Sequence, residues 1–404
     1  MRIWHVGANY SPNDVNGVNY VIWLIAKAQA RLDHEVSLIL DGEPDEAAEE
    51  TAKSCGLNLR TIRGSGFRYQ PAEIERLLKN EPPQMVHFHS VFVPKQAQLA
   101  RRLERAGIPF VVTAHGGLSN HILRRGWLKK RIYSRLIEKP RLMKSSAISV
   151  VMPKEAEEIK RFVPEYRRTI RFVPNPIEDE LFKAKPHRNE AGRKRIVYLG
   201  RFDVEHKGID ILLEIARFIP QADFHLYGAD DAKSRRELGA LKENCTSNVY
   251  FHEPVFGAEK IAVLQSADLY LQTSRWEVFG ISIAEAMALG TPCAVAETMF
   301  LSELFRCEKM GIVLEDDPKK AASRILAALR DEETRREFAC KARKYAVKNF
   351  SASRVAAKYV DFYRDAICAE RAAEWHRRIF EKDFRKIEAS FLEAESTGNE
   401  RKIR

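Results

Sequence analysis

One local pattern occurs twice in this chain and limits the folds open to it. Residues 2–7 form a predicted strand, followed by a polar loop, a helix that begins at Gly17 and a second strand over 35–40. Residues 195–228 repeat this order with a helix that begins at Gly208. Such a unit is the phosphate-binding half of a doubly wound α/β fold. Because 404 residues are too many for one ordinary core, we predict two such domains.

The overall amino-acid composition indicates the broad class of the protein. The apolar and charged fractions, 45% and 30%, are those of a soluble globular protein. No stretch approaches the roughly 18 apolar residues of a membrane span, and the first residues read as a buried strand rather than a signal peptide. The six cysteines show no paired spacing, which favours reduced thiols. We therefore expect a cytoplasmic protein.

The segment 273–296 combines a polar loop, two acids and an apolar helix. Gly280 is predicted to open the helix and Gly290 to end it, with a short buried strand after it. The free N–H groups and positive dipole end of such a helix form a seat for phosphate. Glu277 lies just before the helix and Glu285 about one turn into it. Both carboxylates can therefore face one pocket.

Within this segment, EVFGISIAEAMALGTPCAVA resembles the E-x7-E signature of the family-4 retaining glycosyltransferases, which have the GT-B fold. The resemblance covers residues 2–368 in order and is more specific in the second half. It implies an α/β, GT-B fold with two Rossmann-like doubly wound domains facing a cleft. We expect an acceptor-binding domain over 1–176 and a nucleotide-sugar-binding domain over 177–350. A helix over 351–368 would cross back to the first domain, and 369–404 would form a charged helical tail.

The resemblance also implies four catalytic residues. His115 ends a predicted strand, precedes two glycines and matches the family histidine that contacts the donor sugar near the reacting carbon. Arg201 and Lys207 match the cations that neutralise the donor diphosphate while negative charge develops on it. Glu277 would hydrogen-bond hydroxyl groups of the donor sugar.

A second set of residues is implied in donor binding. Glu285 would bind the ribose hydroxyls, backbone N–H groups at the helix start would hold sugar or phosphate oxygens, and two further loops would border the base. A glycine in the first domain would allow close approach of the diphosphate. The predicted donor-binding residues are Gly17, Gly228, Val255, Phe279, Gly280, Ile281 and Glu285.

The implied reaction moves a sugar, with retention, from a nucleotide-sugar co-substrate to a glycan or lipid-linked acceptor in cell-surface polysaccharide or lipopolysaccharide assembly. No D-x-D motif is present, so we expect neither a metal nor another cofactor. Val18, Pro176 and Val278 stand where many relatives have glycine. The alternatives are a GT-B sugar-nucleotide epimerase, a phosphorylase and an inactive glycan- or membrane-binding scaffold. The donor sugar, base and linkage stay open.

Residues 124–144 carry nine bases and one acid, most of the net charge of +11. Apolar residues between them predict a basic amphipathic helix that Pro140 ends. Such a helix can lie on an anionic membrane surface, which would place the protein on the inner face of the plasma membrane. A solvated basic face is the alternative, and the absence of a nucleic-acid-binding motif argues against nucleic acid as a partner.

His87 and His89 alternate along a predicted strand over 85–89 and share one face of it. Two histidines so placed could hold a metal, but no third ligand stands at a suitable spacing. A structural or substrate-contacting role is therefore expected. The tail over 369–404 has an apolar stripe at helical spacing, which could contact a second copy of the chain or pack on the body.

Overall fold

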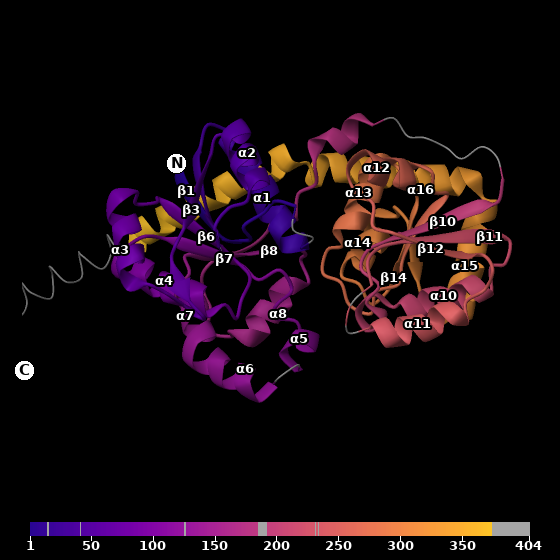
Figure 1. Ribbon diagram of the computed structural model, residues 1–404, viewed down its shortest axis with the longest axis horizontal. Coiled ribbons are helices and arrows are strands. Elements are labelled where there is room, and N and C mark those ends of the chain that lie inside the picture. The colour runs from indigo at the N-terminus through magenta and orange to yellow at the C-terminus, as the bar shows by residue number, and fades with distance from the viewer. Residues whose placement is uncertain are drawn as a thin grey trace, which may run out of the picture.

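The computed structural model describes residues 1–13, 16–40, 42–124, 127–184, 192–230, 232 and 234–373. Two parallel sheets lie side by side, each with helices packed around it (Figure 1). The predicted pair of doubly wound α/β domains is confirmed. The part of the tail from 374 onward lies outside the described residues.

The first sheet has seven parallel strands in the order β3-β2-β1-β6-β7-β8-β9. Its order reverses between β1 and β6, and ligands of open α/β sheets bind outside the carboxyl ends of strands at such a switch point. The strands are β1 (Arg2–Ala8), β2 (Glu35–Leu40), β3 (Leu57–Thr61), β6 (Met85–His89), β7 (Phe110–Thr113), β8 (Ala147–Val150) and β9 (Ile170–Phe172).

Helices join these strands, and one small hairpin lies outside the sheet. The helix α1 starts at the switch point, directly after the polar loop that follows β1. The elements are α1 (Gly17–Ala30), α2 (Glu46–Cys55), β4 (Gly64–Ser65), β5 (Arg68–Tyr69), α3 (Pro71–Asn80), α4 (Pro94–Arg105) and α8 (Glu155–Phe162).

The second sheet has six parallel strands in the order β12-β11-β10-β13-β14-β15. The last of them, β15, was not predicted; it is three residues long and too short to show periodicity. The strands are β10 (Lys194–Leu199), β11 (Ala222–Tyr227), β12 (Val249–His252), β13 (Leu269–Gln272), β14 (Cys293–Ala296) and β15 (Ile312–Leu314). Around them lie α9 (Val204–Lys207), α10 (Ile209–Arg217), α11 (Arg235–Glu243), α12 (Gly257–Gln265), α13 (Ile281–Leu289), α14 (Leu301–Glu308), α15 (Pro318–Arg330) and α16 (Glu332–Asn349).

A long C-terminal helix over 352–373 returns from the second domain to the first, as expected (yellow in Figure 1). It begins where Ile177 N–H donates to the Phe350 carbonyl at 2.8 Å. Its apolar face is buried against strands of the first sheet, and each such side chain contributes about 1.5–3 kcal/mol. The helix contributes Val355, Tyr359, Phe362 and Tyr363 to this cluster, which also contains Ile3, Met85 and Val111.

The predicted basic helix is present as an unbroken helical run over 127–144, but the prediction that Pro140 ends it is wrong. The structure has α5 (Asn120–Arg124), α6 (Trp127–Tyr133), the π-helix η1 (Ser134–Glu138) and α7 (Lys139–Lys144). Pro140 stands in the first turn of α7 instead of ending the helical run. Pro140 follows a π-helix in which the Lys139 N–H donates to the Ser134 carbonyl five residues back, and this helical run passes into α7 although Pro140 itself has no N–H.

Two charges of this segment face the interior rather than solvent. Arg141 and Glu138 form an ion pair with 2.5 Å between nitrogen and oxygen, and their side chains are 2% and 0% exposed. Glu138 also accepts a hydrogen bond from the N–H of Phe92 at 3.0 Å. The pair fastens η1 and α7 to the loop after β6, so these two residues do not belong to the solvated basic face.

Replacing Arg141 with methionine should lower the free energy of unfolding by about 3–5 kcal/mol, because it leaves the Glu138 carboxylate buried and unpaired. Lys144→Met is the control on the same helix: its ion pair with Glu104 is exposed, and its loss should cost under about 1 kcal/mol. Urea denaturation followed by intrinsic fluorescence measures both. Equal effects of the two substitutions would contradict the assignment.

Candidate active site

The centre of the site is the start of α13. Gly280 precedes this helix with a φ of 74°, and a Cβ added there would lie 2.8 Å from Cδ1 of Ile283. Only glycine fits this turn without strain. The Phe279 side chain is buried, with its ring 5.0 Å from that of Phe350. Phe279 can therefore offer a ligand only its backbone, and the predicted donor contact through its N–H group stays a prediction.

The loop before α13 is held against the loop after β10. The short helix α9 is capped by Asp203, whose carboxylate accepts from the N–H of His206 at 2.9 Å. It ends at Gly208, which has a φ of 65°, and a Cβ there would lie 2.2 Å from the carbonyl oxygen of Thr273. This close approach of two backbones places Lys207 beside Glu277.

Lys207 and Glu277 form an ion pair, and their side chains are only 16% and 18% exposed. Burial alone would raise the pKa of Glu277, but Lys207, His206 and Arg201 together hold it below its ordinary value. Glu277 is therefore a carboxylate at neutral pH. Arg201 itself is exposed at the same strand end. The structure thus brings together three of the four predicted catalytic residues.

The second acid has a different environment. Glu285 is 3% exposed on α13, and its carboxylate lies 2.6 Å from Nζ of Lys260 on α12. Burial raises the pKa of Glu285, and Lys260 offsets only part of that effect. The Lys260 ammonium also lies 6.0 Å from the centre of the Tyr20 ring in the first domain. Sequence reasoning missed Lys260, because no local signal relates a lysine on α12 to an acid on α13.

The first domain reaches this centre through its glycine loops. His115 follows β7 with a φ of 48° and is half-buried. At the next residue, Gly116, a Cβ would lie only 2.5 Å from Cγ2 of Val278, the residue after Glu277. The His115 loop therefore touches the Glu277 loop across the domains. The Val278 side chain fills the space beside Gly116 that a glycine at position 278 would leave open.

Gly17 also faces the second domain, where a Cβ on it would lie 3.2 Å from Cδ1 of Ile281. The side chain of Asn16 accepts hydrogen bonds from the N–H groups of Val18 and Asn19, at 2.9 and 3.4 Å. Two N–H groups at the start of α1 are thus already bonded. The diphosphate contact predicted for Gly17 can involve fewer backbone donors than a free helix end would offer.

The two remaining predicted residues also stand at strand ends. Gly228 follows β11, and a Cβ there would lie 1.9 Å from the carbonyl oxygen of Gly200, so the crossing of these loops requires glycine. Val255 follows β12 and is 7% exposed, packed into the core of the second domain. Its side chain has a structural role, and a base could contact it only along the loop backbone.

A stack of three rings, which sequence reasoning missed, crosses between the domains. The Trp276 indole lies with its ring centre 4.6 Å from that of His206 and 3.4 Å from that of His121. His121 belongs to α5 of the first domain, whereas Trp276 and His206 directly precede Glu277 and Lys207. The stack therefore ties both members of the ion pair to the opposite domain.

The structure adds a third histidine to the predicted pair His87 and His89. His5 on β1 lies in register with His87, and its ring joins those of His87 and His89. Among the described residues, these three buried histidines form a group that could hold a metal ion, with ligand atoms within 4.8 Å of one another. The third histidine was missed because it is 82 residues away on the neighbouring strand.

Two facing Rossmann-like domains, with catalytic loops at their strand ends and a C-terminal helix that crosses back, define the GT-B class of glycosyltransferases. Two family models match the chain: "Glycosyltransferase Family 4" over residues 15–181 and "Glycosyl transferases group 1" over 179–345. The chain belongs to the family-4 glycosyltransferases.

Known proteins of similar length resemble it. A phosphatidyl-myo-inositol mannosyltransferase of Mycobacterium leprae is 24% identical, covering 88% of this chain and 94% of its own. The sucrose-phosphate synthase of Thermosynechococcus elongatus superposes with a TM-score of 0.75 at 20% identity, covering 91% of this chain and 100% of its own. HepE of Anabaena, solved with UDP and glucose, has a TM-score of 0.68 at 16% identity, and the match covers 90% of this chain and 100% of HepE. These structural likenesses support the GT-B fold.

The lowered pKa of Glu277 predicts how its ion pair contributes to stability. The contribution is complete above the ordinary glutamate pKa of 4.5 and is lost as the pH falls through the lowered value. The melting temperatures of the wild type and Glu277→Gln should therefore differ by a constant amount between about pH 8 and pH 6, and converge below about pH 4.5. Thermal denaturation measures this. The exposed Glu308→Gln serves as control, and a difference that grows in acid would contradict the pairing.

Proposed function

We propose that this glycosyltransferase transfers a sugar, with retention at the anomeric carbon, from a nucleotide-sugar donor to a glycan or lipid-linked acceptor of cell-surface polysaccharide or lipopolysaccharide assembly. The observation that carries this proposal is the convergence of the Lys207–Glu277 pair, Arg201 and the His115 loop at the N-terminus of α13. HepE, solved with UDP and glucose, supports a nucleotide-sugar donor.

In this proposal the donor diphosphate lies beside Arg201, Lys207 and the start of α13. The two cations and the helix end would offset the negative charge that develops as the sugar leaves. Arg201 is exposed at its strand end, and Lys207 needs only to shift from the Glu277 carboxylate toward the incoming phosphate. These side chains supply the positive charge for which other transferases use a metal ion.

The sugar would lie between Glu277 and His115. Glu277, an ionised carboxylate, accepts hydrogen bonds from sugar hydroxyls, and the half-buried His115 contacts the sugar near the reacting carbon. Glu277 is paired with Lys207 and Glu285 with Lys260, so each carboxylate has its own cation. Neither is assigned as a nucleophile. The acceptor hydroxyl attacks the face from which the diphosphate leaves, and the leaving phosphate oxygen takes its proton.

The donor can be identified by thermal shift with UDP-, GDP-, ADP- and TDP-sugars. A donor at roughly 100 times its dissociation constant should stabilise the protein by about 2.7 kcal/mol, with or without EDTA. Glu285→Ala should lose this shift and the exposed Glu308→Ala should keep it. NMR of the anomeric proton of the product then tests retention. An inverted product, or a glycosyl adduct of the enzyme seen by intact mass, would contradict the mechanism.

A membrane-bound acceptor is supported by the surface of α6 and η1. Leu128, Ile132 and Leu136 recur every four residues and are 57%, 56% and 64% exposed, among exposed bases. An apolar stripe flanked by cations is typical of helices that lie in the interface of anionic membranes. Within the described residues no helix is long and apolar enough to cross a membrane. The M. leprae relative, by its name, acts on a phospholipid.

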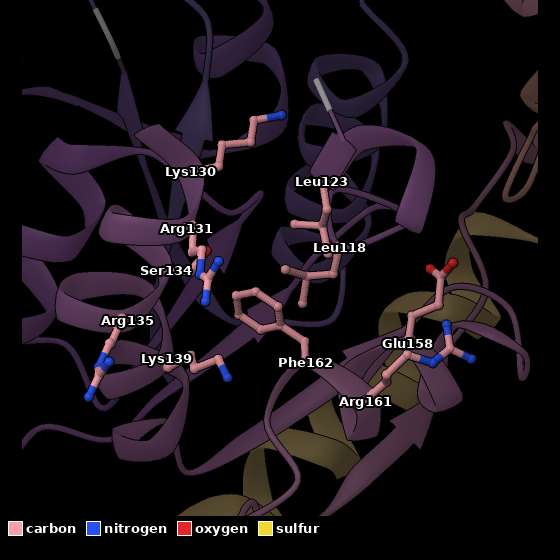
Figure 2. Close-up of a pocket in the computed structure, with 10 residues that line it drawn as sticks. All are labelled: Leu118, Leu123, Lys130, Arg131, Ser134, Arg135, Lys139, Glu158, Arg161 and Phe162. Carbon is pink, nitrogen blue, oxygen red and sulfur yellow. The ribbon is translucent and has the colours of Figure 1, made fainter. Parts of the chain in front are cut away.

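A pocket of about 590 Å³ opens beside these helices (Figure 2). Its centre is apolar, with the Phe162 ring close to Leu118 and Leu123, and five cations and one acid, Glu158, line it around this centre. An acceptor with an anionic group and an apolar portion fits this lining. The cations are Lys130, Arg131, Arg135, Lys139 and Arg161.

Replacing Leu128, Ile132 and Leu136 together with serine should reduce co-sedimentation with vesicles of phosphatidylglycerol and phosphatidylcholine, because each loses an apolar side chain worth about 1 kcal/mol or more in the interface. Phe218→Ser, an exposed aromatic in the second domain, is the control. The wild type should bind phosphatidylcholine vesicles weakly, since they lack negative charge. Sedimentation that the triple substitution does not change would rule out this surface.

A further inference from the structure

A continuous line of hydrogen-bonded side chains runs through the first domain and ends at His115. Gln29 Oε1 lies 2.8 Å from Nε2 of His5, and Nδ1 of His5 lies 3.0 Å from Nε2 of His89. Nδ1 of His89 then lies 3.0 Å from Nε2 of His115. Gln29, His5 and His89 are completely buried, so the first two of these bonds are shielded from bulk solvent.

The histidines of this line are neutral. Burial lowers the pKa of His5 and of His115 to about 4, and that of His89 well below its ordinary value. A neutral imidazole donates from one nitrogen and accepts at the other. Each imidazole in the line must therefore donate from one nitrogen and accept at the other. The group that begins the line, Gln29, decides which nitrogen of each ring is the donor.

Gln29 supplies that direction. Its side-chain nitrogen faces the hydroxyl of Tyr363 on the crossing helix at 3.5 Å, and its oxygen faces His5. An amide oxygen can only accept, so His5 donates from Nε2 and accepts at Nδ1. His89 must then donate from Nε2 and accept at Nδ1. The bond to His89 therefore requires the proton of His115 to be on Nε2.

We propose that Gln29, through His5 and His89, holds His115 as the Nε2–H tautomer, so that its Nδ1 is a permanent hydrogen-bond acceptor for a hydroxyl group of the donor sugar. Gln29, His5 and His89 are thereby positioning residues that act through His115. The assignment of the tautomer rests on the hydrogen-bond line alone. The identity of the group that donates to Nδ1 rests on the proposed function.

His87 lies beside the line but does not belong to it. Its nitrogens lie 2.7 Å from the Tyr363 hydroxyl and 2.7 Å from the Thr113 hydroxyl, and its ring centre is 3.9 Å from that of His89. Every ring nitrogen of His5, His87 and His89 thus has a hydrogen-bond partner. A metal ion bound by all three histidines would break at least two of these hydrogen bonds, so the geometry favours the hydrogen-bonded line over a metal site.

The first test is a long-range proton–nitrogen NMR spectrum of the wild-type protein labelled with nitrogen-15 in histidine. His115, assigned by the signals lost in His115→Gln, should show a protonated Nε2 and an unprotonated Nδ1. A protonated Nδ1 would overturn the proposal. So would stoichiometric zinc in the protein as purified. Neither readout needs transfer activity, so a failure of the proposed function would leave this result intact.

The second test compares two substitutions of Gln29. Gln29→Glu keeps an oxygen that accepts from His5, so the tautomer should persist and turnover should stay within about twofold. Gln29→Met removes the acceptor, so both tautomers of His115 should appear and kcat should fall by about tenfold, the effect of one hydrogen bond. The KM for the donor nucleotide sugar should change much less, because the line ends at one hydroxyl group of the sugar and does not reach the nucleotide and diphosphate, which make the other contacts of the proposed donor site.

The control is Gln96→Met. Gln96 is equally buried and bonds the same strand end, donating to the carbonyl oxygen of His89 at 2.7 Å, but it does not belong to the line. It should leave the tautomer of His115 unchanged. Equal losses of kcat in Gln29→Glu and Gln29→Met, with one tautomer in both, would overturn the proposal. If either variant fails to fold, the wild-type spectrum still decides.

Discussion

Backbone segments approach one another at this site more closely than any side chain would permit, and the rest of the site depends on these contacts. A Cβ at Gly208 would lie 2.2 Å from the Thr273 oxygen, and one at Gly228 would lie 1.9 Å from the Gly200 oxygen. At Gly116 it would lie 2.5 Å from the Val278 side chain of the opposite domain. Because four strand-end loops meet in this way, Lys207 lies against Glu277 and the His115 loop touches the Glu277 loop.

The charges in this small volume are arranged to keep the two acids distinct. Lys207 and its neighbours lower the pKa of Glu277, whereas burial raises that of Glu285 despite Lys260. Glu277 is thus held firmly as a carboxylate, whereas Glu285 is held less strongly in its charged form. Two carboxylates eight residues apart on one motif can therefore serve different parts of one donor molecule.

The C-terminal helix over 352–373 links the packing of the two domains to the hydrogen-bonded line that ends at His115. Its aromatic face is buried in the first domain, although it starts at the end of the second. Tyr363 on this helix contacts Gln29, the first residue of the line that ends at His115, and His87, which lies beside that line. The same helix that holds the domains together thus also bears on the orientation of a predicted catalytic side chain.

The sequence by itself determined the repeated strand–loop–helix units, the placement of α13 between Gly280 and Gly290, and the family, because these depend on local periodicity and on glycines at fixed spacing. It misled at Pro140, which stands in the first turn of α7 and does not end the helical run over 127–144. Only the tertiary structure decided that Lys260 pairs with Glu285, that Trp276 stacks between two histidines, and that His5 joins His87 and His89. The reason is physical. Each of these contacts joins residues from separate segments of the chain, so it forms only when the chain packs and cannot be recognised in the local sequence pattern.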